Sequence, residues 1–336
     1  MSVRVAINGL GRTGRSFLRA VRAQESSAEV VAINDLGKPS SMANLLRRDS
    51  VFGRWRQSIE TTSDRISVGG QDMAFLSEAD PTRLPWRDLG VDVVIESTGL
   101  FTERSKAATH LEAGAARVIV SAPCKGADAT FIVGVNEETF DPGSHRVISN
   151  GSCTTNCFVP MVKVLDEAFG LAKGLMTTVH AYTGDQNLVD GPHKDDRRAR
   201  NAAVNIVPTS TGAARATSLV LEAMQQRLDG AALRVPVADG SIVDFTATLE
   251  RSATVEEVND AFRAAAHGDQ LGRVLEYSDD PIVSTDVIGS SASCIFDAPL
   301  TMVVDDLVKV FGWYDNEYGY ACRLVDLVGV VGAART

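Results

Sequence analysis

The 336-residue sequence predicts an α/β protein with two different sheets. Residues 1–151 predict a doubly wound parallel sheet, because short apolar runs alternate there with helical patterns. Residues 152–315 predict an α+β domain with a mainly antiparallel sheet, because the apolar runs there are longer and have short or distant connections. The boundary near residue 150 is a change of pattern, since no linker rich in Gly, Ser or Pro marks it. At roughly 100–200 residues per domain, the length fits two domains or one large α/β unit.

Six apolar runs in the first part have the length of buried strands. They comprise residues 3–7, 29–33, 91–96, 117–121, 130–133 and 146–149. Helical spacing of apolar residues is present at 15–22 and 105–113. This alternation implies crossover connections and a mostly parallel sheet, whereas residues 47–80 fit a strand pair or a long loop.

The second part begins with a helix expected over residues 153–169, where apolar side chains recur at helical spacing. A strand at 174–180 precedes a polar, basic stretch at 185–201 that we interpret as a long ordered loop. Further strands are expected at 232–237, 241–249 and 298–311, and helices at 254–266 and 316–331. Thr254 and Glu257 form a capping box at the start of the first of these helices.

Composition places the chain among globular proteins and excludes several other classes. Hydrophobic residues make up 44% and charged residues 23%, which excludes a disordered chain, and no apolar run is long enough to span a membrane. The net charge of −10 argues against nucleic-acid binding. The N-terminus lacks the pattern of a secretory signal, so we expect a cytoplasmic protein. The five cysteines of the chain are scattered, which predicts free thiols. They lack the paired spacing of metal ligands, so we expect no metal site.

A glycine motif follows the first expected strand. Gly9, Gly11 and Gly14 fit G-x-G-x-x-G between a strand and a helix, and Asp35 ends the second strand 21 residues after Gly14. The glycines allow a pyrophosphate to approach the backbone at the helix N-terminus, and the carboxylate can bond ribose hydroxyls. The alternative is a glycine turn with a solvated Asp. The complete series in this order favours a Rossmann-type dinucleotide-binding domain.

Cys153 is the candidate nucleophile. It lies in the run NGSCTTNC, directly before a helical pattern, and the field of a helix N-terminus stabilises a thiolate. Cys157 falls one turn later and is expected to pack inside the helix. An isolated Cys is more often a small buried hydrophobe, but the polar context of Cys153 favours reactivity.

His180 and a group of basic and hydroxyl side chains follow Cys153. His180 ends a strand and can act as a base on a thiol if the fold brings the two together, although a lone His is more often structural. Arg234 lies inside an apolar strand, where a charge requires an anionic partner. The run Thr209–Gly212 before a helix offers hydroxyls and amides to an anion. Most of the other basic residues after His180 fit a solvated or subunit-facing loop.

These motifs resemble those of the phosphorylating glyceraldehyde-3-phosphate dehydrogenase family. The matching stretches, in family order, are INGLGRTGR (7–15), ND (34–35), ESTGLFT (96–102), SAP (121–123), NGSCTTNC (150–157), TTVHAYTGDQ (177–186), PHKDDRRAR (192–200), VPTSTGAAR (207–215), LRVPV (233–237) and WYDNEYGY (313–320). The resemblance implies a catalytic domain after an NAD-binding domain, and a C-terminal helix (316–336) that returns to the latter. It also implies a homotetramer and glycolysis or gluconeogenesis.

The resemblance implies roles for individual residues. Cys153 corresponds to the nucleophile and His180 to its base. Cofactor binding is implied for Gly9, Gly11, Arg12, Thr13, Gly14, Asp35, Thr98, Ser121, Asn316 and Tyr320, with Asn316 on the nicotinamide carboxamide. Thr183 and Arg234, with Asp185 beside them, correspond to the site for the substrate phosphate. Ser152, Thr154, Thr211 and Gly212 correspond to the site for inorganic phosphate, and Arg198 lies between the two.

Four positions depart from the usual family pattern. Gly151 replaces Ala before SCTTNC and is expected to loosen the helix entry slightly, while Arg215 replaces Lys and keeps the charge. Gly191 stands where NAD-specific members usually carry Leu, and with Lys38 it could leave room for a 2′-phosphate. Asp35 makes NAD the first choice of cofactor, with NADP as a possible second one.

The resemblance implies a reaction and leaves two rivals. Cys153 attacks the aldehyde of glyceraldehyde 3-phosphate, and NAD reduction leaves a thioester that phosphate cleaves to give 1,3-bisphosphoglycerate. One rival is an erythrose-4-phosphate dehydrogenase, against which HAYTGDQ and PTSTGAA argue because they follow the triose pattern. The other is a non-catalytic dinucleotide-binding protein, against which the intact Cys153, His180 and Arg234 argue.

Overall fold

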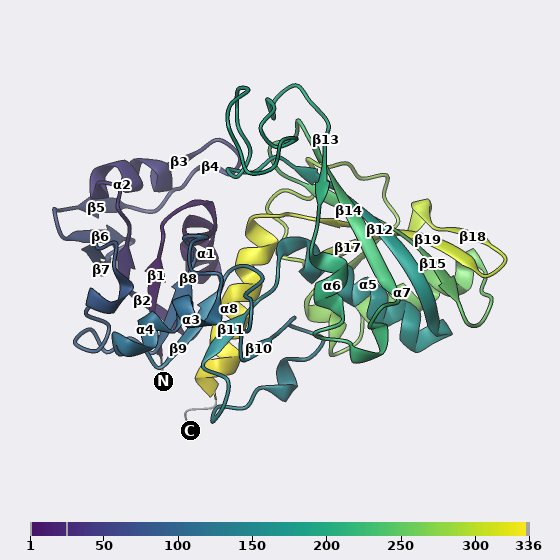
Figure 1. Cartoon of the computed structure of the whole chain (residues 1–336), viewed down its shortest axis with the longest axis horizontal. Coiled ribbons are helices and arrows are strands. Elements are labelled where there is room, and N and C mark those ends of the chain that lie inside the picture. The colour runs from purple at the N-terminus through teal and green to yellow at the C-terminus, as the bar shows by residue number, and fades with distance from the viewer. Residues whose placement is uncertain (1, 25, 334–336) are drawn as a thin grey trace. The chain divides into compact units, whose positions relative to one another are not determined.

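A computed structural model describes residues 2–24 and 26–333, which form two compact units. The first contains residues up to 131, 136–151 and those from 321 onward, and the second contains 132–135 and 152–320 (Figure 1). Residues 1 and 25 of the domain expected over 1–151, and residues 334–336 of the helix expected over 316–336, lie outside the described residues.

The first unit is built on a nine-stranded sheet. In spatial order its strands are β10 (Ala129–Thr130), β11 (Val147–Ser149), β9 (Arg117–Val120), β8 (Val93–Glu96), β1 (Val3–Asn8), β2 (Ala28–Asn34), β7 (Gln71–Leu76), β6 (Arg65–Val68) and β5 (Ile59–Thr61). All neighbours from β10 to β7 are parallel, and only β6 and β5 join antiparallel. Parallel strands need covered faces, which explains their continuous apolar runs.

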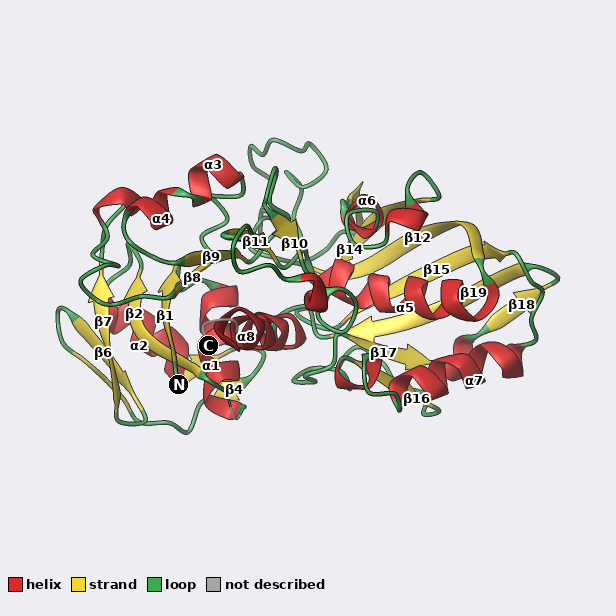
Figure 2. Cartoon of the chain, turned by 90° about the horizontal axis from the view of Figure 1, so that it is seen from below, coloured by secondary structure: helices red, strands yellow, loops and turns green. Residues whose placement is uncertain are grey.

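Helices lie on both faces of this sheet, as a doubly wound fold requires (Figure 2). They are α1 (Arg12–Ala23), α2 (Pro39–Arg47), α3 (Arg104–Ala107), α4 (Thr109–Glu112) and, from residue 321, α8 (Tyr318–Ala333), with the short pair β3 (Arg48–Asp49) and β4 (Gly53–Arg54) after α2. In the core, Trp86 and Val94 are fully buried beside Val118. The sheet therefore presents the carboxyl ends of β8, β1 and β2 along one edge.

The second unit is built on an eight-stranded sheet. Its spatial order is β13 (Val207–Ser210), β14 (Leu228–Val235), β12 (Leu171–Ala181), β15 (Ser241–Leu249), β19 (Leu307–Tyr314), β17 (Cys294–Asp297) and β16 (Leu275–Ser278), with β18 (Met302–Val304) on β19. Only β12 with β14 and β16 with β17 are parallel. Helices α6 (Ala213–Thr217), α5 (Cys153–Phe169) and α7 (Val255–Ala266) accompany the sheet (Figure 2). The two sheets confirm the predicted fold class, and Thr254 and Glu257 form the predicted capping box.

Several predicted boundaries were wrong, each for a local reason. The strand predicted at 298–311 is a hairpin of β18 and β19, because the chain turns at Asp305, whose φ is +55°. The strand predicted at 130–133 is limited to β10, since the chain turns after Thr130. Helix α8 begins at Tyr318 instead of Asn316, because the Asp315 carboxylate accepts the backbone N–H groups of Glu317 and Tyr318 at 2.8 and 2.7 Å.

Candidate active site

Cys153 is the first residue of α5, and the local structure explains its position. Gly151 has a φ of +63°, a conformation that favours glycine, so this residue enters the helix without backbone strain. Ser152 caps the helix by accepting the Thr155 N–H at 3.1 Å. One turn further, Phe158 packs edge-to-face on Phe245 of β15 with centroids 4.8 Å apart. The helix N-terminus is therefore fixed against the sheet.

His180 lies at the end of β12 and reaches Cys153. The distance from its Nε2 atom to Cys153 Sγ is 3.4 Å. Its Nδ1 atom lies 2.7 Å from the carbonyl oxygen of Ala181, and a carbonyl only accepts, so Nδ1 carries the proton in the neutral ring. The lone pair of Nε2 therefore faces the thiol. This is the arrangement of a base that can accept the thiol proton.

Burial disfavours a negative charge on Cys153 or a positive charge on His180 when either forms without the other. Burial raises the pKa of the Cys153 thiol to about 11, which the positive charge of Arg234 opposes. Burial, together with the positive charge of Arg234, lowers the pKa of His180 to about 4. The expectation that the helix N-terminus stabilises a Cys153 thiolate is therefore not met, because desolvation outweighs Arg234 and the hydrogen bonds from Thr154. Cys153 keeps part of its surface exposed, which moderates the effect. In this contact, a charge on one group is stabilised by the opposite charge on the other, which proton transfer from sulfur to Nε2 creates.

Two arginines lie close to this pair. Arg234 of β14 is directly opposite His180 in the parallel register with β12, and its Nη1 atom donates to Thr183 Oγ1 at 2.8 Å. Its Nε atom is buried and has no hydrogen-bond partner among the described residues. Burial lowers the pKa of Arg234, and the neighbouring charge of Arg198 lowers it further. A buried guanidinium with a free N–H next to a second cation favours an anionic ligand.

Arg198 belongs to the long loop predicted over 185–201, and that loop contains neither helix nor strand. The Arg198 guanidinium bonds Asp185 and donates from Nε to Thr209 Oγ1 at 3.0 Å. Thr209 in turn donates to Asp195 at 2.9 Å. Arg198 is thus oriented by fixed partners next to Arg234.

The hydroxyl residues expected for the second anion lie at two helix starts. Ser152 caps α5, and Thr211 accepts the Ala213 N–H at 3.2 Å just before α6. Gly212 is exposed, and a side chain there would meet open space. Thr154 is buried, its hydroxyl lies 2.9 Å from Tyr314 OH, and its backbone N–H and hydroxyl both hydrogen-bond Cys153, whose pKa they lower.

Asn316 lies just before α8 and is 7% exposed. Its Oδ1 atom accepts a hydrogen bond from Ser241 Oγ at 2.7 Å, and Ser241 Oγ accepts the Ala181 N–H at 3.1 Å. This orientation leaves Asn316 Nδ2 buried without a partner among the described residues. An unpaired buried amide N–H fits the carbonyl oxygen of a carboxamide such as that of nicotinamide. Tyr320 lies on α8 one turn further and is buried.

The glycine motif of the first unit lies on a cavity of about 340 Å³. Gly9 has a φ of +94°, and a Cβ atom there would lie 2.8 Å from Thr98 N. A Cβ atom at Gly14 would lie 2.2 Å from the Gly9 oxygen, whereas at Gly11 it would meet open space beside the cavity. The three glycines therefore provide a tight turn, close packing and access for a ligand, which fits a dinucleotide.

Polar groups complete this cavity. Asp35 accepts the Leu10 and Gly37 N–H groups at 2.8 and 2.7 Å, so its carboxylate is fixed beside the glycine turn. Thr98 also lines the cavity, while Ser121 donates to the Glu96 carbonyl oxygen at 3.0 Å. Arg12 forms an ion pair with Asp49, and Thr13 is half-buried in the first turn of α1. Lys38 is exposed at the start of α2.

Sequence reasoning missed two buried residues next to the predicted ones. Tyr314 OH lies between Thr154 Oγ1 and Thr178 Oγ1, at 2.9 and 2.7 Å, with its ring against His180. Ser241 orients Asn316. Tyr314 belongs to the WYDNEYGY motif and gave a signal, whereas Ser241 is an ordinary strand residue and gave none.

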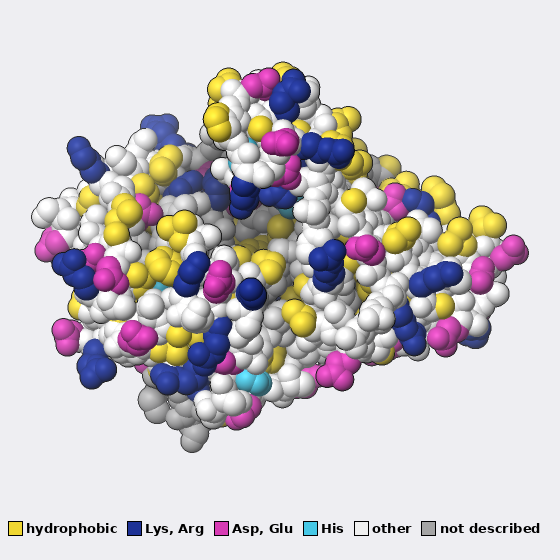
Figure 3. All heavy atoms as spheres, in the orientation of Figure 1, with side chains coloured by type: hydrophobic (Ala, Val, Ile, Leu, Met, Phe, Trp, Pro, Cys, Tyr) yellow, Lys and Arg dark blue, Asp and Glu magenta, His cyan; other side chains and the backbone are white. Residues whose placement is uncertain are grey.

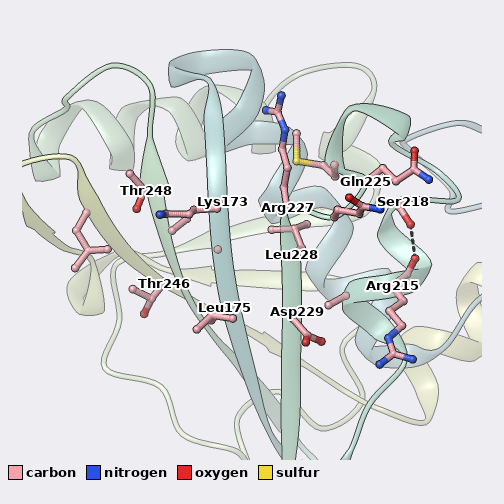
Figure 4. A pocket seen from close by; sticks show the side chains of 16 residues that line it. Lys173, Leu175, Arg215, Ser218, Gln225, Arg227, Leu228, Asp229, Thr246 and Thr248 are labelled. Atoms are coloured by element: carbon pink, nitrogen blue, oxygen red, sulfur yellow. Dashed lines mark hydrogen bonds between the residues drawn. The ribbon is translucent and has the colours of Figure 1, made fainter.

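A larger hollow of about 860 Å³ lies on the exposed face of the second sheet. Figure 4 shows Lys173 and Leu175 on β12, Leu228 on β14 and Thr246 on β15 around it. Arg215 lines it, but none of the residues predicted to bind cofactor, substrate or phosphate does, so it is not the site of the chemistry. Over the face in Figure 3, basic and acidic side chains are intermingled.

Within residues 2–24 and 26–333, no group of three or more His, Cys, Asp or Glu side chains is arranged to hold a metal ion. No helix in this described part is long and apolar enough to cross a membrane.

A dinucleotide-binding unit followed by a unit with an oriented Cys–His pair defines the class as an NAD-dependent oxidoreductase. Residues 3–104 match the model of the glyceraldehyde 3-phosphate dehydrogenase NAD binding domain, and residues 152–316 match that of the C-terminal domain. The chain belongs to the glyceraldehyde-3-phosphate dehydrogenase family. It is 54% identical to the glyceraldehyde-3-phosphate dehydrogenase of Streptomyces coelicolor and 55% identical to that of Mycobacterium avium. Each comparison covers 99% of both chains.

Proposed function

We propose that this chain is an NAD-dependent enzyme that oxidises and phosphorylates glyceraldehyde 3-phosphate to 1,3-bisphosphoglycerate, in glycolysis or gluconeogenesis. The observation that carries the proposal is the 3.4 Å contact between Cys153 Sγ and the unprotonated Nε2 of His180. Family membership supports the choice of substrate, because the relatives of similar length are named for this activity.

The acid–base work belongs to Cys153 and His180. His180 Nε2 accepts the thiol proton as sulfur bonds the aldehyde carbon and then returns it to the resulting oxyanion, which gives a hemithioacetal. NAD, when bound, supplies the hydride acceptor. The same imidazole accepts the hydroxyl proton as the carbonyl forms, so that Cys153 carries a thioester. Phosphate then bonds the acyl carbon, the C–S bond breaks, and the sulfur leaves with its electron pair and regains a proton.

The two anions of this reaction have separate candidate sites. Arg234 and Thr183, with Asp185 nearby, would bind the substrate phosphate, and the buried free Nε–H of Arg234 supports this assignment. Ser152, Thr154, Thr211 and Gly212 would bind the attacking phosphate, with Arg198 between the two sites.

The cofactor residues follow from the cavity and from Asn316. Gly9, Gly11, Arg12, Thr13 and Gly14 would bind the pyrophosphate. Asp35 would bind the adenosine ribose, with Thr98 and Ser121 along the cofactor and Asn316 and Tyr320 at the nicotinamide. The fixed carboxylate of Asp35 favours NAD, whereas exposed Lys38 leaves NADP as a weaker alternative.

Assembly and location complete the proposal. The sheet face around the large hollow exposes Leu175 and Leu307, at 68% and 43%, and Val304 beside them at 66%. Exposed apolar patches of this kind are typical of subunit contacts, which supports a homotetramer. We propose a cytoplasmic location.

Steady-state kinetics of the purified chain test the proposal. We expect NADH formation that requires both glyceraldehyde 3-phosphate and phosphate. A higher kcat/KM with erythrose 4-phosphate would favour the paralogous activity. Bound NAD without turnover of either substrate would identify a non-catalytic dinucleotide-binding protein.

A further inference from the structure

Two buried carboxyl groups that the proposed mechanism does not use lie beside Asn316. Asp239 and Asp315 are each 1% exposed. Strands β15 and β19 pair Ser241 with Tyr314, so that the ends of these strands bring residues 239–241 next to 315–316. The carboxyl pair therefore adjoins the hydrogen bond from Ser241 that orients Asn316.

The hydrogen bonds show which carboxyl group is ionised. Asp315 accepts three backbone N–H groups, from Glu317 and Tyr318 at Oδ1 and from Gly289 at Oδ2, all between 2.7 and 2.8 Å. Asp239 accepts only one, from Gly240 at 2.9 Å, and its Oδ2 atom is buried without a donor among the described residues. Three N–H donors stabilise the anion of Asp315, so the proton of the pair belongs on Asp239.

Electrostatics support the same assignment. The two side chains lie within hydrogen-bonding range, and two carboxylates there would repel each other in a poorly solvated place. Burial, together with the charges of Asp315 and Glu317, raises the pKa of Asp239 to about 8. With one proton, Asp239 Oδ2 donates to Asp315, and the otherwise unpaired atom is satisfied.

We propose that Asp239 is a positioning residue whose neutral carboxyl donates to Asp315 and thereby holds Ser241 against Asn316. The inference rests on the proposed function, because it assigns Asn316 Nδ2 to the nicotinamide. Ionisation of Asp239 places two carboxylates side by side and separates the two segments. Asn316 then loses its orientation, and the affinity for the nicotinamide end of the cofactor falls.

Binding measurements below and above about pH 8 test this role. The wild-type Kd for NAD should rise by roughly tenfold per pH unit above the pKa, while the Kd for AMP, which lacks the nicotinamide, stays constant. Asp239→Asn stays neutral and can still donate to Asp315, so its NAD affinity should not depend on pH. Asp239→Ala should bind NAD weakly at every pH. The matched control is Asp297→Asn, at a buried carboxyl that accepts from Trp313 Nε1, and it should behave like wild type.

The same pH dependence of NAD binding in wild type and Asp239→Asn, or a parallel loss of AMP binding, would overturn the inference.

Thermal unfolding provides a second test that needs no cofactor. A carboxyl with a raised pKa in the folded state makes the protein less stable as pH rises from about 4 to about 8. Asp239→Asn should therefore gain Tm over wild type at pH 8 but not at pH 4, and an equal difference at both would contradict the shared proton. If the protein showed this Tm pattern but did not bind NAD, the proposed function would be contradicted and the shared proton would stand.

Discussion

Replacing His180 with Asn removes the base but leaves Cys153 in place. Without a proton acceptor, the reaction must use the small fraction of thiol that ionises by itself. With a pKa of about 11, about one Cys153 thiol in a thousand is ionised at pH 8. Because each pKa unit corresponds to about 1.36 kcal/mol, forming that thiolate costs about 4 kcal/mol. We therefore expect kcat/KM to fall by about 10²–10⁴-fold, the usual contribution of a positioned base.

The alkylation rate of Cys153 by iodoacetamide measures this directly, since only the thiolate reacts. In His180→Asn the rate should be low at neutral pH and rise about tenfold per pH unit up to about pH 11. Wild type should react faster at neutral pH, because the imidazole takes the proton. Cys153→Ser provides the background of labelling at the other cysteines. A rate in His180→Asn that is fast and constant from pH 6 to 9 would show that the helix N-terminus alone ionises the thiol, which would refute the reasoning.

Four more substitutions test other parts of the site. Cys153→Ser should abolish turnover and retain NAD binding. Cys157→Ser should keep substantial activity, because Cys157 is fully buried. Equal losses of activity in the two variants would contradict these roles. Arg234→Leu should raise the KM for glyceraldehyde 3-phosphate far more than that for NAD, and equal effects would remove Arg234 from the phosphate site. Asp35→Ala should lower the kcat/KM preference for NAD over NADP. It should weaken the interaction with NAD and relieve the repulsion of NADP, each by about 1–3 kcal/mol. An unchanged ratio would show that Asp35 does not discriminate at the ribose.

The sequence predicted the parts of this structure that local rules determine. The glycine motif requires its three glycines for reasons confined to one turn, and the capping box of α7 involves two residues one turn apart. Both sheet types were predicted because strands that alternate with helices imply parallel crossovers, whereas longer apolar runs with short or distant connections imply antiparallel pairing.

The remaining features depend on contacts that spacing does not reveal. The hairpin at Asp305 contains no glycine or proline to mark its turn, so β18 and β19 looked like one strand. The orientation of Asn316 depends on Ser241, 75 residues away. The state of Cys153 depends on how much solvent the surrounding residues exclude, and this desolvation outweighs the helix field that the sequence indicated.

The most direct test of the account is a single turnover with glyceraldehyde 3-phosphate and NAD in the absence of phosphate. If Cys153 carries a thioester that phosphate cleaves, NADH should form in a burst of about one equivalent per active subunit and then stop. Mass spectrometry of the acid-quenched protein should find the acyl group on the Cys153 peptide, and added phosphate should release it and restart turnover. Sustained NADH formation without phosphate, or an acyl group on another cysteine, would contradict the account.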